Sequence, residues 1–387
     1  MIQLEEYQSL DVDLDDSDLA HLLSMVRGES EEDEAKVIQS ITPTKKPNAY
    51  RVRLGHFVGR LGLPSGRTID VRSRFPLGRV VDLIRYSGRL PIRLDKLAPA
   101  MDAEDFLIDV IALAYSREVG RLLAYGLAKG YRHYQFDRPP YPGVPDLIAH
   151  LGRHGGRPDK LVTRARRITI DIELNRALAA AIEVLSRVPL AREPTRMLKS
   201  VYPAFGRVAR VPTRADSLAR LELTRLTSRY RQSLALAEVI LRGQSLAGEG
   251  VAMEGSSVLF NMAKVWESCV AKWAQSVWGE GHQVSEQYPF DISAGGELRA
   301  NADVVVQRDG ELVALYDAKY KWPGSAPSLG DVYQLVTYCT RLGLPEATLV
   351  YPSPAGEKSF RIGGVTVKAI GLDVSSLPHG IVSAEVG

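Results

Sequence analysis

Alternating apolar and polar residues dominate the chain between residues 50 and 72. The alternation covers residues 50–54, 56–61 and 68–72, and a Pro-Ser-Gly sequence at 64–66 marks a turn. A period of two is typical of strands that bury one face. The pattern therefore predicts a small β module, which together with the preceding acidic segment forms an N-terminal domain over residues 1–100.

Helical spacing of apolar residues predicts a second, mainly helical region over residues 101–243. One helix is expected to begin at Asp102, where early acids suit the positive end of the helix dipole, and others at 171–187 and 217–242. Residues 131–142 form a predicted proline-rich loop whose aromatic and basic side chains either stack on nucleic-acid bases or pin their own loop. Small polar residues at 243–250 mark the domain boundary.

The last region, residues 244–387, has a clear order of predicted elements. A helix at about 257–277 is followed by strands at 283–289, up to Val306 and up to Asp317, then by a helix at 329–342 and a strand at 347–351. The chain is thus predicted to be a multidomain protein of the α+β or α/β class.

Composition places the chain among ordinary globular proteins, with 387 residues, 45% of them hydrophobic and 25% charged. No signal sequence or apolar run of membrane-spanning length occurs, so we expect a cytoplasmic protein. Cys269 and Cys339 lie in apolar, helix-like surroundings and are expected to be buried thiols.

Charge is distributed unevenly along the chain. Residues 1–34 hold twelve acids and one base, Arg27, which gives this segment a charge of −11. Because the net charge of the whole chain is +3, the remainder carries +14. A basic body indicates either contact with nucleic acid or a solvated surface.

Two acidic residues are predicted to meet in the last region. Asp303 opens one apolar run, Asp317 closes the next, and Lys319 follows two residues later. The Arg-Asp-Gly-Glu sequence at 308–311 is typical of a hairpin turn, which would set the two carboxylates side by side. This arrangement suits a hard divalent cation and a water molecule, and an ordinary ion pair with Lys319 is the alternative.

An ordered set of residues around these acids resembles the core of the PD-(D/E)xK nucleases, including the Gln-xxx-Tyr element of their RecB-like branch. The resemblance implies an αβββαβ core. The residues that carry it are Glu267, Asp303, Asp317, Ala318, Lys319, Gln334 and Tyr338.

Longer stretches are similar to McrC, the nuclease subunit of the modification-dependent McrBC restriction systems. They lie at 260–267, 317–321, 331–335 and 349–352, and more loosely at 58–75 and 169–176. The resemblance implies a McrB-like AAA+ GTPase ring as partner, docked on residues 1–100 and stimulated by this chain. It also implies cleavage of modified double-stranded DNA, with nuclease dimerisation as a route to double-strand breaks.

The chemistry of these side chains suggests a role for each site residue. Asp303, Asp317 and the backbone carbonyl of Ala318 would hold Mg²⁺, for which Mn²⁺ substitutes, and Glu267 would add a ligand directly or through water. Lys319 would orient the attacking water or stabilise negative charge at the phosphate. Gln334 and Tyr338 would position the site or the DNA backbone.

The chain departs from these families at two places. Ala302 replaces the proline of the nuclease motif, and Arg72-Ser73-Arg74 stands where McrC proteins commonly carry a Pro-Lys pair. Two other functions therefore stay open: a non-catalytic adaptor of a motor ring with a degenerate nuclease fold, and a stand-alone RecB-like nuclease. The chain has no GxxxxGK[ST], HExxH or paired CxxC sequence, and so no nucleotide or zinc motif of its own.

The most basic stretch of the chain lies between residues 150 and 167, where six bases face one acid, Asp159. We expect either a flexible loop that contacts DNA phosphates or a solvated loop. The six residues are Arg153, Arg157, Lys160, Arg164, Arg166 and Arg167.

Removing these charges should distinguish the two alternatives. If the residues contact phosphates, glutamine substitutions should weaken DNA binding and lower the slope of log K against log salt by about 0.9 for each phosphate that is no longer neutralised. The measurement is the Kd for duplex DNA over a range of salt concentrations. An unchanged slope would identify a solvated segment.

Overall fold

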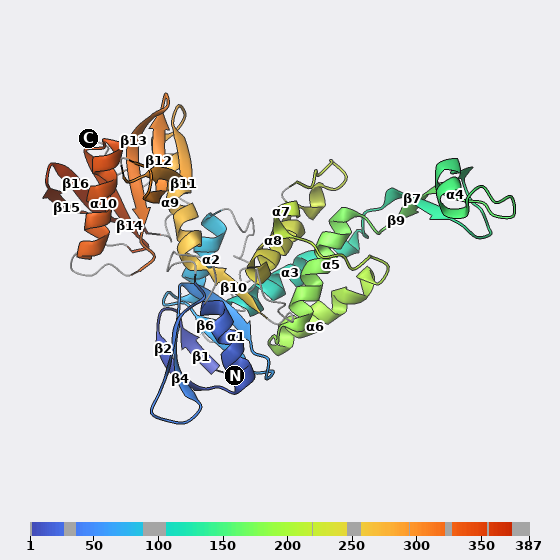
Figure 1. Cartoon of the computed structure of the whole chain (residues 1–387), viewed down its shortest axis with the longest axis horizontal. Helices are drawn as coiled ribbons and strands as arrows, with labels where there is room; N and C mark the ends of the chain where they lie inside the picture. The colour runs from blue at the N-terminus through green and yellow to red at the C-terminus, as the bar shows by residue number, and fades with distance from the viewer. Residues whose placement is uncertain are drawn as a thin grey trace. The chain divides into compact units, whose positions relative to one another are not determined.

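The computed structural model describes residues 2–26, 36–87, 106–218, 220–245, 257–293, 295–321, 327–353 and 356–373 (Figure 1). The chain forms two compact units, one made of Met1–Val110 with Gly243–Gly387 and the other of Ile111–Arg242. The fold is mixed α+β, as predicted. The expected helix start at Asp102, most of the linker at 243–250 and the acids at 29–34 lie outside the described residues. No helix in the described ranges has the length and apolar character needed to cross a bilayer.

Two sheets build the N-terminal part of the first unit. Their core holds Leu22 of α1 (Asp16–Val26), Ile38 and Leu61, all fully buried. The strands predicted at 50–54, 56–61 and 68–72 are confirmed, but β1 and β2 were missed because they lie in the acidic segment. One sheet has the order β1 (Ile2–Glu5), β6 (Thr68–Arg72), β5 (Phe57–Gly62), β10 (Val258–Asn261), and the other β2 (Ser9–Asp13), β4 (Ala49–Leu54), β3 (Ile38–Pro43).

Strand β10 joins the N-terminal sheet although it follows the helical region in sequence. It pairs antiparallel with β5, with Val258 opposite Arg60 and Asn261 opposite Phe57. It then continues directly into α9 (Met262–Trp278), where the Asn261 side chain caps the helix by accepting from the Lys264 amide at 3.1 Å. The helix predicted from residue 257 therefore starts later, because residues 258–261 pair as a strand.

A buried ion cluster lies under this sheet. Arg60 is 2% exposed, and its guanidinium bonds the Asp70 carboxylate with a 3.2 Å contact from Nη2. The same nitrogen lies 3.5 Å from Asp109 Oδ2 in α3 (Leu107–Ala124). The cluster therefore neutralises the buried arginine from two elements.

The C-terminal part of the first unit contains the predicted order of helix, three strands, helix and strand. Its sheet has the order β11 (Gln283–Asp291), β12 (Arg299–Arg308), β13 (Glu311–Ala318), β14 (Glu346–Tyr351), β16 (Val365–Gly371), β15 (Lys358–Ile362). Helix α10 (Leu329–Leu342) has the predicted bounds. The parallel pairing of β14 with β13 follows from the helical crossover α10 between them, whereas β14 and β16 pair in parallel because the chain returns through β15.

Helices α9 and α10 cover opposite faces of this sheet. The Tyr316 ring packs on Trp273 of α9, whereas the adjacent Leu315 belongs to a core with Leu335 and Cys339 of α10. Successive residues of a strand point to opposite faces, so the two helices must lie on different sides. Cys339 and Cys269 are both buried thiols, as predicted.

The second unit is built on helices and a β arm. Its helices include most of α3 with α5 (Glu173–Arg187), α6 (Arg192–Val201) and α8 (Arg231–Ser245). The buried Asn175 amide joins three segments, because it donates to Ala128 O at 2.9 Å and to Ile170 O and accepts from Tyr230 OH at 2.7 Å. The arm, residues 130–169, consists of β7 (Gly130–Phe136), β8 (Val144–Pro145), α4 (Leu147–His154) and β9 (Thr163–Thr169).

Three predictions for the second unit were wrong. The segments expected to be loops, 131–142 and 150–167, instead contain β7, α4 and β9. Strands β7 and β9 pair along their whole length, with Gly130 opposite Thr169 and Phe136 opposite Thr163. The long helix expected at 217–242 is broken after α7 (Ala215–Leu218) and resumes at α8. Near the break, the Thr227 hydroxyl accepts from the Thr224 amide at 2.8 Å, a local bond that competes with helical pairing.

Candidate active site

The hairpin of β12 and β13 brings Asp303 and Asp317 together, as predicted. Asp309 and Gly310 adopt positive φ angles of 51° and 85° at the turn, which is typical of a tight hairpin. The ladder pairs Val304 with Tyr316, so Asp303 and Asp317 are the next residues on the two strands. Asp303 Oδ2 accepts from the Ala318 amide at 2.8 Å, which fixes the first carboxylate beside the second.

Lys319 reaches back over this carboxylate pair. Its Nζ lies 2.8 Å from Asp317 Oδ2 and donates to Gln334 Oε1 at 3.2 Å. Gln334 Nε2 in turn lies 3.1 Å from the Tyr338 hydroxyl, one turn along α10. The structure therefore joins Lys319, Gln334 and Tyr338 in one chain of contacts, and the i, i+4 spacing of Gln334 and Tyr338 on α10 accounts for the second of its links.

The two strand-end carboxylates repel each other in a buried place. Burial raises the pKa of Asp303 well above its ordinary value, and the charges of Asp317 and Glu267 raise it further. Burial also raises the pKa of Asp317, while Lys319 opposes that shift. A cation between these groups would offset both the free-energy cost of burying negative charge and the repulsion between the carboxylates.

Glu267 lies in α9 and is buried at 5% exposure. Its Oε2 accepts from Gln287 Nε2 at 2.9 Å. Gln287 comes from β11, where its neighbours Glu286 and Tyr288 pair with Val304 and Ala302, and it holds a positive φ of 51°. An unfavourable backbone angle at a polar residue beside buried acids is typical of a functional site.

Gln287 and Asp331 were not predicted from the sequence. A polar residue within a predicted strand was the only signal for Gln287. Asp331 Oδ1 lies 3.8 Å from Lys319 Nζ, and its Oδ2 lies 2.6 Å from Lys321 Nζ. Burial alone would raise the pKa of Asp331, but bonds from Lys321 and Ser328 and the charge of Lys319 outweigh it, so that pKa is lowered. Its spacing of three residues from Gln334 on α10 could have identified it.

The chemistry of this site fits a small hard cation. Within the ranges that the structure covers, no three His, Cys, Asp or Glu side chains are placed to hold one ion together. Magnesium is commonly held by one or two carboxylates with several waters, so the pair Asp303 and Asp317 is sufficient in number and kind. The arrangement can therefore hold a hydrated cation beside the Lys319 side chain.

The six bases predicted to contact DNA all lie on the arm of the second unit. Arg157 pairs with Asp159 at 3.1 Å, and Arg153 of α4 lies 3.8 Å from Asp137. On β9, Arg166 lies over the ring of Tyr131 and Arg167 over that of Phe136, each at 4.8 Å. These contacts favour the alternative that the aromatic residues pin their own segment, and they leave exposed arginines along the strand.

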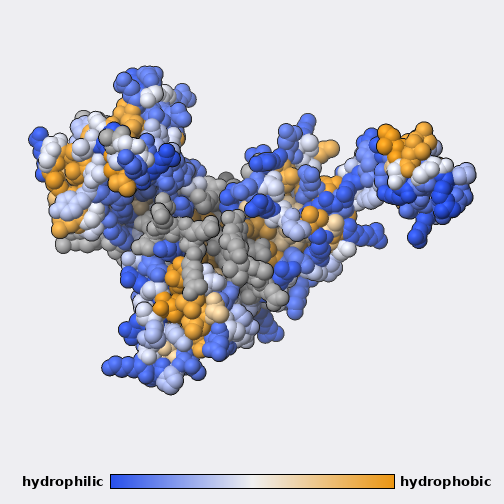
Figure 2. Space-filling model, viewed as in Figure 1, coloured by the Kyte–Doolittle hydropathy of each residue, from blue (hydrophilic) through white to orange (hydrophobic). Residues whose placement is uncertain are grey.

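Helix α4 presents an apolar surface on the same arm. Leu147, Ile148 and Leu151 are all exposed, Ile148 at 87%, and Val144 of β8 adds to them. Figure 2 shows these apolar residues gathered at the position of α4 in Figure 1. Contiguous apolar side chains in water indicate a surface that meets another molecule.

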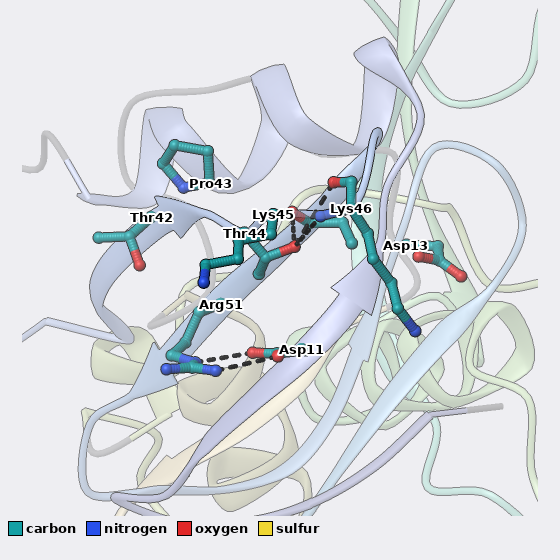
Figure 3. Close-up of a pocket in the computed structure, with 9 residues that line it drawn as sticks. Asp11, Asp13, Thr42, Pro43, Thr44, Lys45, Lys46 and Arg51 are labelled. Carbon is teal, nitrogen blue, oxygen red and sulfur yellow. Dashed lines mark hydrogen bonds and ion pairs between the residues drawn. The ribbon is translucent and has the colours of Figure 1, made fainter.

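A surface pocket of about 690 Å³ lies on the sheet of β2, β3 and β4 (Figure 3). Asp11 lines it, but both of its oxygens are bonded by Arg51, at 2.7 and 3.0 Å. Thr44 Oγ1 donates to Ala49 O at 2.9 Å in the neighbouring turn. The acids and lysine of the strand-end site do not line this pocket.

Comparison with known proteins agrees with the fold. The family model described as McrBC 5-methylcytosine restriction system component matches residues 52–352. No curated protein matches the sequence. A refined half-complex from a tetradecameric assembly of Thermococcus gammatolerans McrB AAA+ hexamers with bound McrC has 16% identity and a TM-score of 0.65, over 99% of this chain and 96% of that chain.

A cryo-EM structure of the Thermococcus gammatolerans McrBC complex is less similar, with 13% identity and a TM-score of 0.47, over 72% of this chain and 88% of that chain. The family match covers most of the sequence, including Asp303, Asp317 and Lys319. The resemblance to McrC is thereby confirmed, and the chain belongs to the McrBC 5-methylcytosine restriction system component family.

Proposed function

We propose that this chain is the Mg²⁺-dependent endonuclease subunit of a McrBC-like restriction system, with a PD-(D/E)xK core. The observation that supports the proposal most is the buried pair Asp303 and Asp317 with Lys319 in contact with Asp317. The order α9, three strands, α10 and β14 is the order implied by that nuclease superfamily.

In this proposal Asp303, Asp317 and the carbonyl of Ala318 hold Mg²⁺, with Mn²⁺ as a substitute. When bound, the ion supplies positive charge to the phosphate and lowers the pKa of a water molecule. Glu267 already accepts a bond from Gln287, which favours its acting through water rather than as a direct ligand. Gln287 holds that carboxylate in one orientation.

Lys319 carries the second positive charge of the proposed site. Its ammonium contacts Asp317 Oδ2 and Gln334 Oε1 in the geometry described above. A phosphate oxygen that accepts a bond from this ammonium would be stabilised as negative charge develops on it. Gln334 and Tyr338 position the ammonium, and Asp331 Oδ1 lies 3.8 Å from it.

We propose a McrB-like AAA+ GTPase ring as the partner that delivers modified double-stranded DNA and whose GTP hydrolysis this chain stimulates. The family is that of McrBC components, and the chain has no nucleotide motif of its own. The exposed apolar residues of α4 support a contact with the motor on the arm, in addition to the docking on residues 1–100 that the resemblance implies. Pairing of two nuclease domains would give double-strand breaks.

Asp317→Ala removes one of the two opposed carboxylates. Cleavage of modified duplex DNA with Mg²⁺, GTP and the motor should fall at least about 100-fold, because a bound ion contributes several kcal/mol and about 1.4 kcal/mol corresponds to tenfold in rate. Assembly with the motor, measured by size-exclusion chromatography, should be unchanged. The matched control is Glu311→Ala, an exposed acid at the start of β13, which should cut normally.

The same assay distinguishes the other two functions. A non-catalytic adaptor would give no cut product with Mg²⁺ or Mn²⁺ under any condition, although it would still stimulate the motor. A stand-alone nuclease would cut fully without the motor. Full cleavage by the Asp317→Ala variant would contradict the proposed site itself.

Magnesium should stabilise the metal-free chain more at pH 8 than at pH 5. Asp303 has a higher pKa in the folded protein than the value of about 3.9 expected in the unfolded chain. The folded protein therefore loses stability as the pH rises from about 3.9 through the raised pKa, because the buried carboxyl must ionise. Mg²⁺ binds the ionised carboxylates and should restore about 2.7 kcal/mol at 100 times its Kd. Thermal unfolding with and without Mg²⁺ at the two pH values measures this difference.

Asp303→Asn should raise the Tm of the metal-free protein at pH 8 and abolish the effect of Mg²⁺, because it removes one of the repelling charges. Asp309→Asn, at the exposed hairpin turn of the same strands, is the matched control and should behave as the wild type. An equal Mg²⁺ effect in the Asp303→Asn variant would argue against this metal site.

Ile148→Asp places a charge in the middle of the apolar surface of α4. If the motor covers this helix, stimulation of its GTPase should fall at least about 30-fold at limiting concentrations, which corresponds to the ~2 kcal/mol typical of an interface hot spot. Leu226→Asp is the matched control, since Leu226 is 85% exposed outside the arm. Normal stimulation by Ile148→Asp would remove α4 from the interface.

A further inference from the structure

Tyr320 follows Lys319 directly but packs on the N-terminal part of the first unit. Its side chain is buried, at 3% exposure, although it lies in the segment after β13. The ring centroid lies 5.1 Å from that of Phe75, and the Arg74 guanidinium lies 5.7 Å from it. The Tyr320 hydroxyl is 3.0 Å from Ser73 Oγ, which follows β6. Tyr320, although it follows β13, is thus enclosed by residues that follow β6 of the N-terminal sheet.

The Tyr320 hydroxyl acts as a donor in this contact. Ser73 Oγ gives its only proton to Glu6 Oε1 at 2.8 Å, so the Tyr320 hydroxyl donates, with Ser73 Oγ and the Glu6 carboxylate as its acceptors. Glu6 Oε1 also accepts from the Arg74 amide at 3.0 Å. Burial, together with Glu6, raises the pKa of Tyr320 well above its ordinary value, which keeps the hydroxyl protonated. We call Tyr320, Ser73, Glu6 and Arg74 the Tyr320 network.

Strand pairing makes the far end of this network rigid. Glu6 follows β1 and Ser73 follows β6, and these are neighbouring parallel strands joined by the Glu6 amide donating to Arg72 O at 2.8 Å. The same sheet includes β10, and the Met262 amide at the start of α9 donates to His56 O at 2.8 Å. The sheet therefore anchors both the helix of Glu267 and the segment of Lys319.

The backbone of Lys319 is held on its other side by the nuclease sheet. Its amide donates to Val350 O at 2.9 Å, and its carbonyl accepts from the Lys321 amide at 2.9 Å. The Lys321 ammonium then bonds Asp331 at 2.6 Å. The segment 319–321 is therefore held by β14 and α10 on one side and by the Tyr320 side chain on the other. A displacement of Tyr320 would move the adjacent Lys319.

We propose that Tyr320 is a positioning residue that fixes Lys319 through Ser73 and Glu6, so that the N-terminal sheet forms part of the support of the nuclease site. This inference rests on the proposed nuclease function. A misplacement of about 1 Å in a reacting group can lower a rate about 100-fold. A partner that displaces the N-terminal sheet would therefore change cleavage without touching the metal ligands.

Tyr320→Phe tests the inference, because it removes the hydroxyl and keeps the ring. With the motor, Mg²⁺ and GTP, kcat for DNA cleavage should fall about 10-fold while KM for DNA and the Mg²⁺ effect on Tm stay the same. Ser73→Ala should give a similar loss of kcat, and the double variant Tyr320→Phe with Ser73→Ala should be no slower than either single variant. Ser73→Thr keeps the hydroxyl and should therefore cut at the wild-type rate. Tyr316→Phe is the matched control, since this tyrosine lies in β13 and its hydroxyl accepts from Trp278 Nε1 of α9 at 2.9 Å, outside the Tyr320 network.

A second measurement does not depend on cleavage. Lys319 is 12% exposed, so Tyr320→Phe should speed its acylation by acetic anhydride at least about threefold relative to Lys368 in the same sample, read by mass spectrometry. Unchanged kcat in Tyr320→Phe would overturn the inference and leave the nuclease proposal standing. If the wild type cuts no DNA, the nuclease proposal fails, and unchanged acylation of Lys319 would then overturn the positioning role as well.

Discussion

The repulsion between two buried carboxylates, Asp303 and Asp317, is the constraint on which the rest of the site depends. Strand pairing places them next to each other, and burial raises the pKa of both. Such a pair is tolerable at neutral pH when one carboxyl stays protonated or when positive charge lies nearby, and Lys319 Nζ lies 2.8 Å from Asp317. The polar residues around them, Gln334 and Gln287, fix groups that would otherwise be free to rotate.

The surrounding fold holds this site from two sheets. The hairpin of β12 and β13 supplies the acids, whereas the N-terminal sheet carries β10 into α9 and encloses Tyr320. Two elements of one site therefore depend on strands that begin near Ile2 and Thr68. Loss of packing in the N-terminal sheet would disturb the site even though its strands supply none of the proposed metal ligands.

The sequence predicted the nuclease-like part of the chain well because its signals are local. Alternation, a turn with Asp309 and Gly310, and the spacing of Gln334 and Tyr338 on one helix each depend on a few neighbouring residues. The family resemblance is confirmed, whereas the metal and the individual roles of the site residues stay predictions. Gln287 and Tyr320 could not be found in this way, since their partners are brought close only by sheet pairing and by packing between distant segments.

Strand β10 also constrains how the chain can fold. Until residues 258–261 are available, the edge of β5 has no partner, and the whole second unit separates the two strands in sequence. An open edge exposes unpaired backbone groups to other chains, and pairing over such a separation is slow. During synthesis, the N-terminal sheet therefore stays incomplete until the helical unit has emerged, so its last strand and the first nuclease helix should become ordered in the same step.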